Sequence, residues 1–276
     1  MADLRCPRCA YDLSWMPGQW TTSCPVEGRC TECGLTFEWP ILMNPSLVAP
    51  TWFCEHPLRR PRYGVWRTFA RVLRPNPFWT SVPIEVPVKL LPLSLGLAGC
   101  LLVSYLLVGL MVVQDEVGLP PRLLYLEQAL LDPLLPMRAE WFFGRFSREL
   151  LAMLLAWISM PLVFMVLPIS ISRARVSTRQ LLRPVTYSGV ALPMFVAVFW
   201  VAVIFNDAPG QAMPNLWIDM YVVRIWAHWL VLLWLGVFWW RACAYLRLDH
   251  PRWIALAMTT IAFLVGLVAI SMHLLR

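Results

Sequence analysis

Apolar residues form long uninterrupted runs over the C-terminal two thirds of the chain. A helix needs about 20 apolar residues to cross the ~30 Å hydrocarbon core of a bilayer. Five runs approach or exceed this length, at residues 90–113, 150–171, 185–205, 221–240 and 253–272. Pro161 and Pro168 free backbone groups within the second run and should kink or break it. The pattern therefore predicts a five-helix transmembrane bundle over residues 89–276.

A different pattern precedes the bundle, in a Pro- and Arg-rich stretch at residues 41–88 that is predicted to be a linker. From Tyr63 to Arg74, apolar residues recur at helical spacing while arginines fall on the other side. Such a basic amphipathic helix is typical of the membrane interface, where its aromatic rings enter the acyl boundary and its cations meet anionic head groups. The arginines expected to contact lipid are Arg60, Arg67, Arg71 and Arg74.

The composition agrees with a membrane protein. Of the 276 residues, 59% are hydrophobic and 14% are charged, whereas soluble domains average about 45–50% and about 25%. These values exclude an ordinary soluble globule, and equally a disordered, collagen-like or coiled-coil chain.

Basic residues gather in the loops predicted on one side of the membrane. Between the second and third runs lie Arg173, Arg175, Arg179 and Arg183, and between the fourth and fifth lie Arg241, Arg247 and Arg252. The loop at residues 206–220 has no arginine or lysine. Because these residues accumulate on the cytoplasmic side, we expect a cytoplasmic N-terminus and an external C-terminus. No cleavable signal peptide is expected, since Met1–Arg8 lacks an apolar core. The loop at residues 114–149 is expected to lie outside.

Four cysteines form two close pairs near the N-terminus, Cys6-Pro-Arg-Cys9 and Cys30-Thr-Glu-Cys33. Four thiolates can surround one zinc ion tetrahedrally, and each C-x2-C turn presents two of them. Gly34, directly after the second pair, suits the positive φ that such a turn tends to need. We therefore predict a zinc ribbon over residues 1–40, in which Cys6, Cys9, Cys30 and Cys33 hold a structural Zn²⁺. A redox dithiol and disulfide bonds are the alternatives.

The other four cysteines lack this pairing. Cys24-Pro25 also resembles the start of a zinc-binding turn, so Cys24 could replace Cys30, but we interpret it as a spare thiol. Cys54 and His56 form a C-x-H pair with no second pair to complete a metal site, and we interpret them as incidental. Cys100 and Cys243 lie in or beside predicted spans and are expected to pack.

The N-terminal head resembles the RCPRC-x-YDL…C-x-x-CG zinc ribbons that precede the membrane spans of many bacterial proteins. The matching residues are Arg5, Cys6, Pro7, Arg8, Cys9, Tyr11, Asp12, Leu13, Cys30, Cys33 and Gly34. This resemblance covers about the first 40 residues and implies a bacterial inner-membrane protein. A cytosolic N-terminal region followed by five spans is also similar, in topology rather than in motif, to the Yip family. The DLYGP-type signature of that family's eukaryotic members is missing, so vesicle-trafficking functions are not implied.

Ionisable groups near the fourth run are candidates for function because burying a charge in a membrane is costly. Arg224 and His228 are four residues apart and share a helix face, and with Asp219 they could form a polar cluster. Alternatively, Arg224 extends to the outer head groups. Trp226, Trp229 and Trp234 could contact lipid or a quinone, or simply pack against neighbours.

These observations predict an all-α polytopic membrane protein with five transmembrane helices and a small four-cysteine zinc ribbon. Walker A, G-x-S-x-G, H-E-x-x-H and G-x-G-x-x-G motifs are missing, so we expect no enzyme and assign no catalytic residue. The expected role is a non-catalytic accessory or scaffold subunit that docks a protein partner through the ribbon and contacts membrane lipids. The alternatives are a lipid or small-molecule transporter using the polar cluster, and a membrane-tethered nucleic-acid-binding regulator. Nucleic acid is an unlikely partner, because residues 1–40 hold three arginines against five carboxylates, a net charge of −2.

Overall fold

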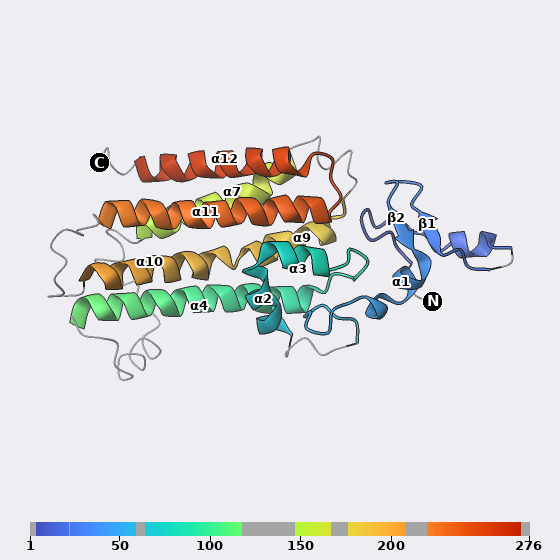
Figure 1. The fold of residues 1–276 in the computed structure, drawn as a ribbon, viewed down its shortest axis with the longest axis horizontal. Helices are drawn as coiled ribbons and strands as arrows, with labels where there is room; N and C mark the ends of the chain where they lie inside the picture. The colour runs from blue at the N-terminus through green and yellow to red at the C-terminus, as the bar shows by residue number, and fades with distance from the viewer. Residues whose placement is uncertain are drawn as a thin grey trace. The chain divides into compact units, whose positions relative to one another are not determined.

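The chain is mostly helical, with one small β-hairpin (Figure 1). The computed structural model describes residues 4–21, 23–58, 64–117, 147–166, 176–207 and 220–271. The N-terminal part contains η1 (Met16–Gln19), β1 (Glu27–Arg29), β2 (Thr36–Glu38), α1 (Trp39–Met43) and η2 (Pro45–Leu47). Two short helices follow, α2 (Val65–Val72) and α3 (Pro75–Ser81). The longer helices are α4 (Leu90–Val117), α7 (Ser147–Val166), α9 (Thr178–Ser188), α10 (Ala191–Asp207), α11 (Met220–Tyr245) and α12 (Pro251–Ser271).

Several helices are those of a multi-pass membrane protein. Within the described ranges, four segments are long and apolar enough to cross a bilayer: Leu90–Gly109, Thr178–Val201, Trp226–Tyr245 and Pro251–Val268. A shorter apolar helix covers Leu150–Val166. It corresponds to the second predicted run, and Pro161 lies within it, whereas Pro168 is outside the described residues. The sequence runs thus correspond to four candidate spans and one shorter helix.

The candidate span that corresponds to the third predicted run begins earlier than the sequence predicts. Helix α9 starts at Thr178 and includes Arg183 and Pro184, so the candidate span covers Thr178–Val201 rather than 185–205. The prediction that Arg179 and Arg183 lie in a loop is wrong, because both belong to α9, where the side chain of Arg183 is fully buried. Arg173 and Arg175, and most of the loop at 114–149, lie outside the described residues.

The chain divides into two compact units, of which the first comprises residues 1–97, 161–188 and 237–257. Its N-terminal part, the predicted ribbon, contains a β-hairpin in which β1 and β2 pair antiparallel with Gly28 opposite Phe37. Leu13, Leu35, Phe37 and Trp39 form the buried core of the ribbon together with two of the cysteines. This core is small, and domains of this size commonly gain stability from a bound metal ion.

The helical part of the first unit is built around aromatic rings. Tyr187 of α9 is fully buried, and its ring centroid lies 5.2 Å from those of Phe69 in α2 and Phe78 in α3. Trp79 in turn packs on Phe238 at 5.4 Å. The stretch at residues 41–88 therefore contributes short helices and large buried side chains to this unit.

The second unit comprises residues 98–160, 189–236 and 258–276. Small residues allow helices of this unit to approach closely. A Cβ atom added to Gly266 in α12 would lie 4.0 Å from both the carbonyl oxygen of Ala152 and the Cβ of Ala156 in α7. Ala262 and Gly266, two small residues four positions apart in α12, are both buried. Gly266 thus serves packing within the bundle.

Candidate metal centre and a buried polar network

Two turns of nearly the same geometry present the paired cysteines. In the first, the N–H of Cys6 donates to the carbonyl oxygen of Tyr11 (2.8 Å) and that of Ala10 donates to Cys6 (2.9 Å). In the second, the N–H of Cys30 donates to Leu35 (2.9 Å) and that of Gly34 donates to Cys30 (3.0 Å). The two hydrogen-bond pairs are equivalent, five and four residues apart in each turn. Each turn therefore aims two sulfurs at the same point.

The residue after each pair adopts a left-handed backbone. Gly34 has φ 70°, as the sequence predicts, and Ala10 occupies the equivalent position with φ 60°. Such a conformation costs an L-residue with a Cβ atom roughly 1–2 kcal/mol. The first turn therefore adopts the geometry of the second although its sequence does not favour it.

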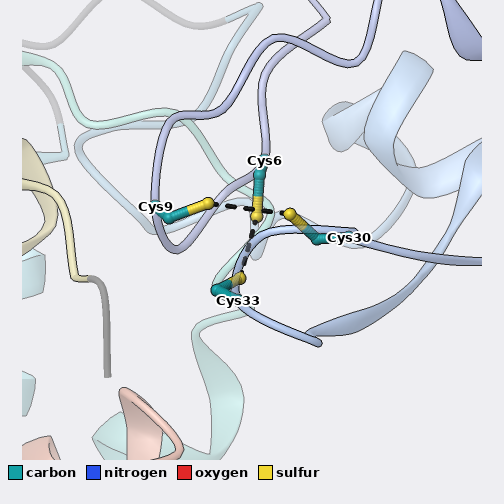
Figure 2. A group of neighbouring side chains, drawn as sticks. All are labelled: Cys6, Cys9, Cys30 and Cys33. Carbon is teal, nitrogen blue, oxygen red and sulfur yellow. Dashed lines mark hydrogen bonds between the residues drawn. The ribbon is translucent and has the colours of Figure 1, made fainter. Parts of the chain in front are cut away.

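The four sulfur atoms converge as a tetrahedral metal site requires (Figure 2). All four ligand atoms of Cys6, Cys9, Cys30 and Cys33 lie within 4.8 Å of one another. The Sγ atoms of Cys6 and Cys33 are 3.5 Å apart, and those of Cys9 and Cys30 are 3.7 Å apart. With Zn–S bonds of about 2.3 Å, a regular tetrahedron has S···S edges of about 3.8 Å. The four cysteines are thus clustered suitably for a metal ion such as zinc.

Burial and backbone amides set the thiol acidity at this centre. Burial raises the pKa of the Cys6 thiol far above its usual range, although the amides of Cys9 and Arg8 act in the opposite direction. Burial likewise raises the pKa of Cys9 to about 11. Burial also acts on Cys30, but the amides of Cys33 and Glu32 and the neighbouring thiols outweigh it, and the pKa of Cys30 is lowered. Without a cation, the first pair therefore favours protonated thiols, and binding a metal releases protons.

The remaining cysteines lie apart from this cluster. Cys24 is exposed, and its thiol donates to the carbonyl oxygen of Pro25 (3.3 Å), so the structure brings Cys30 and not Cys24 to the centre. Cys100 and Cys243 are buried, consistent with packing roles. Cys54 is also buried, and its Sγ lies 3.3 Å from the hydroxyl of Tyr187. Burial raises the pKa of the Cys54 thiol.

Next to Cys54 lies a buried ion pair that the sequence analysis missed. Glu55 and Arg183 are both 0% exposed. The guanidinium Nε donates to Oε1 of Glu55 (3.0 Å) and Nη2 donates to Oε2 (2.9 Å), which is the bidentate arrangement of a strong pair. Glu55 comes from the segment before α2, whereas Arg183 belongs to the candidate span Thr178–Val201. The pair thus joins two segments 128 residues apart.

Other groups complete the hydrogen bonding of both charges. Tyr187 donates its hydroxyl to Oε1 of Glu55 (2.7 Å), and the N–H of Lys89 donates to Oε2 (3.0 Å). Arg183 also donates to the carbonyl oxygen of Val86 (2.9 Å) and to the hydroxyl of Tyr245. A charge in a low-dielectric interior is tolerated only when paired and fully hydrogen-bonded. The network meets that requirement.

One signal in the sequence could have indicated Glu55. It is the only acidic residue between Glu38 and Glu85, in a stretch that is rich in arginine. Its partner could not be identified from the sequence, because the chain has several arginines far from Glu55 along the sequence. Arg183 also lies in a segment that the sequence predicts to be a loop. The buried pair is therefore a product of the tertiary fold.

Of the arginines predicted to contact lipid, Arg67 and Arg71 belong to α2 and Arg74 follows this helix. Arg67, Arg71 and Arg74 are exposed, and Cζ of Arg71 lies 4.3 Å from the ring centroid of Trp52. Arg60 lies outside the described residues. The apolar face of α2 packs against protein, since Val65, Phe69 and Val72 are buried, and only Trp66 and Leu73 remain outward.

The predicted polar cluster cannot be assembled from the described side chains. Asp219 lies outside the described residues, and Arg224 is described only as part of α11. The imidazole of His228 lies 4.7 Å, centroid to centroid, from the ring of Phe195 in α10. His228 is thus placed among helices of the second unit.

The ribbon also makes hydrogen bonds to the helical part of its own unit. The N–H of Ser177, just before α9, donates to the carbonyl oxygen of Arg8 (2.7 Å). The side chain of Arg8 donates to the carbonyl oxygen of Arg247 (3.1 Å), and the side chain of Arg247 donates to Thr36 in β2 (3.0 Å). The metal-binding turn and the turn after α11 are therefore connected.

Comparisons with protein-family models, with curated proteins and with solved structures find no match to this chain. The resemblances to ribbon-headed bacterial proteins and to the Yip family therefore stay predictions.

Proposed function

We propose that this chain is a non-catalytic accessory or scaffold subunit of a membrane complex, in which a zinc-bound cytosolic ribbon docks a protein partner. The proposal includes five membrane crossings, a bacterial inner-membrane location, a cytoplasmic N-terminus and an external C-terminus. The observation that carries it is the convergence of four cysteine sulfurs on one point. Zinc in structural sites is four-coordinate, so four protein sulfurs leave it no position for a substrate or a catalytic water. A site of this kind stabilises a recognition module.

The ribbon surface supports a protein partner better than a nucleic acid. Large apolar side chains face outward from it, with Trp15 44% and Val26 67% exposed. Its strands carry exposed carboxylates at Glu27 and Glu38. Exposed aromatic and aliphatic groups are typical anchors of protein interfaces, whereas phosphate contacts need clustered positive charge. In this proposal, Arg60, Arg67, Arg71 and Arg74 hold the segment before α4 against anionic lipid.

The test is purification of the full chain in nanodiscs, followed by mass spectrometry and elemental analysis. We expect one zinc per chain and a partner subunit in fixed ratio. The substitution Val26→Asp should abolish partner binding without loss of zinc, because it places a charge on the apolar ribbon surface. Leu58→Asp is the matched control, since Leu58 is 80% exposed but lies outside the ribbon.

Two results would contradict the proposal. One is turnover or flux by the purified chain alone, which would favour an enzyme or the transporter built on Asp219, Arg224 and His228. The other is salt-dependent binding of nucleic acid through the ribbon, which would favour a membrane-tethered regulator.

A further inference from the structure

Two arginines and two tryptophans gather where α11 ends and α12 begins. Trp240 and Arg241 belong to the last turns of α11, and Arg252 and Trp253 belong to the first turn of α12. Cζ of Arg241 lies 4.4 Å from the ring centroid of Trp240, and Cζ of Arg252 lies 5.3 Å from the same centroid. One indole ring therefore has two guanidinium groups within 5.3 Å of its centroid.

Neither guanidinium is neutralised by a carboxylate in the described part of the chain. Asp249 lies in the same turn, yet forms no ion pair with Arg241 or Arg252. The Nε of Arg241 is buried and has no hydrogen-bond partner among the described groups. Two cations near one ring repel each other, and an anion bound by both would relieve that repulsion. Arg247, the third arginine of this region, is already bonded to Thr36 of the ribbon.

The position of this cluster indicates where the anion comes from. The candidate spans Trp226–Tyr245 and Pro251–Val268 lie on either side of the turn, so the turn lies at a membrane–water boundary. Trp253 is 70% exposed, as expected of a tryptophan at the level of the head groups. The first amides of α12 add a partial positive charge at the same place.

We propose that Arg241 and Arg252, held by Trp240, bind the phosphate of an anionic phospholipid. A guanidinium group presents parallel N–H donors that match phosphate oxygens, and stacking on an indole fixes its direction before the ligand arrives. The exposed ring of Trp253 supplies the contact with the adjoining acyl region. This site is separate from the ribbon surface in the proposed function, so either proposal can fail alone.

The test is a lipid titration of the full chain in detergent, followed by native mass spectrometry. Wild-type protein should retain phosphatidylglycerol in preference to phosphatidylcholine. The double substitution Arg241→Gln/Arg252→Gln should weaken the tightest phosphatidylglycerol binding by about 30-fold, since each arginine near anionic lipid contributes a factor of about five. Arg241→Lys/Arg252→Lys keeps both charges but loses the forked donors. Its affinity for phosphatidylglycerol should lie between those of the wild type and the Gln double variant.

Arg179→Gln is the matched control, because Arg179 is exposed and, in the described structure, is not stacked on a tryptophan. It should bind phosphatidylglycerol as the wild type does. Equal retention of this lipid by wild type and the Gln double variant would overturn the proposal. Displacement of the lipid by a large excess of inorganic phosphate would show a soluble-anion site and overturn the lipid assignment. If the double variant misfolds, the wild-type preference and the phosphate competition still decide the question.

Discussion

Glu55 and Arg183 form an ion pair in which both charges are buried. Both side chains are completely removed from solvent, and each satisfies the hydrogen bonding of the other. Desolvating an ion pair costs about as much as the attraction returns, so the pair as a whole adds little stability. Loss of one partner is different, because the remaining charge stays buried and unpaired.

Glu55→Gln should therefore destabilise the protein by about 3–5 kcal/mol, the usual cost of breaking a buried pair. The measurement is the thermal unfolding midpoint of the full chain in detergent. Glu85→Gln is the matched control, since Glu85 is half-buried and forms no ion pair with the residues described here. Glu55→Leu/Arg183→Met removes both charges and should recover much of the loss. An unchanged midpoint in the Glu55→Gln single variant would show that the pair does not form.

Ala10 offers a substitution that should raise the stability, because this residue occupies a left-handed conformation. Ala10→Gly should stabilise the ribbon by about 1 kcal/mol by removing the strain of the Cβ atom. Gly34→Ala should cost a similar amount, since an added Cβ atom would meet Arg29 only at an ordinary contact distance of 3.6 Å and only the conformation opposes a side chain. Hydrogen exchange of the ribbon amides in the zinc-loaded protein measures both changes. Equal exchange in Ala10→Gly and wild type would contradict the assigned backbone.

Residue patterns predicted some of these features and missed others for a physical reason. Gly34 was predictable because glycine is the residue that left-handed turns favour. Ala10 was not, since alanine gives no such indication and the turn imposes the conformation. Glu55 and Arg183 were missed because no local pattern links residues so far apart in the chain.

At the scale of elements, the sequence predicts the short helix α2 correctly but places its apolar face against lipid. The spacing of Val65, Phe69 and Val72 predicts a helix within residues 63–74, and α2 covers Val65–Val72. Hydrophobic periodicity indicates that a face is covered but does not say whether lipid or protein covers it. Here protein covers that face, and Phe69 packs on Tyr187.

The packing of α2 against α4 can be tested at Gly96. A Cβ atom at this position would lie 2.0 Å from a ring carbon of Phe69, which is itself only 4% exposed and held by Tyr187. Gly96→Ala should therefore destabilise the protein by about 1–3 kcal/mol, as overpacked cores do. The measurement is again the thermal midpoint.

Gly18→Ala is the control for Gly96→Ala, because no atom lies within 4 Å of the added Cβ at Gly18. Gly96→Ala/Phe69→Leu should recover part of the stability, since the smaller side chain makes room. A Gly96→Ala protein as stable as wild type would show that α2 does not pack on α4 at this point.

At the scale of the whole molecule, two kinds of stabilisation coexist in one chain. The helices bury large aromatic side chains, whereas the ribbon has a core of a few residues around its cysteines. Long apolar runs predict the first kind well, because any span must be apolar over its whole length. Paired cysteines predict the second kind equally well, because a four-sulfur metal site must have all four cysteines. The hydrogen bonds of Arg8, Arg247 and Ser177 connect the ribbon to the helices, and no pattern in the sequence predicts them.

Metal removal should therefore act on one part of the molecule alone. Stripping the full chain with a chelator should expose the amides of Leu13, Cys30 and Gly34 to rapid hydrogen exchange, because their hydrogen bonds lie in the metal-binding turns. The amides of α10 should stay protected, since their bonds are internal to an apolar helix. Acidification should have the same effect as the chelator, because protons compete with the metal for thiols whose pKa burial raises at Cys6 and Cys9. Zinc should thus be retained as the pH rises and released as it falls. Ribbon amides that stay protected in the stripped protein would show that the fold of the ribbon does not depend on metal.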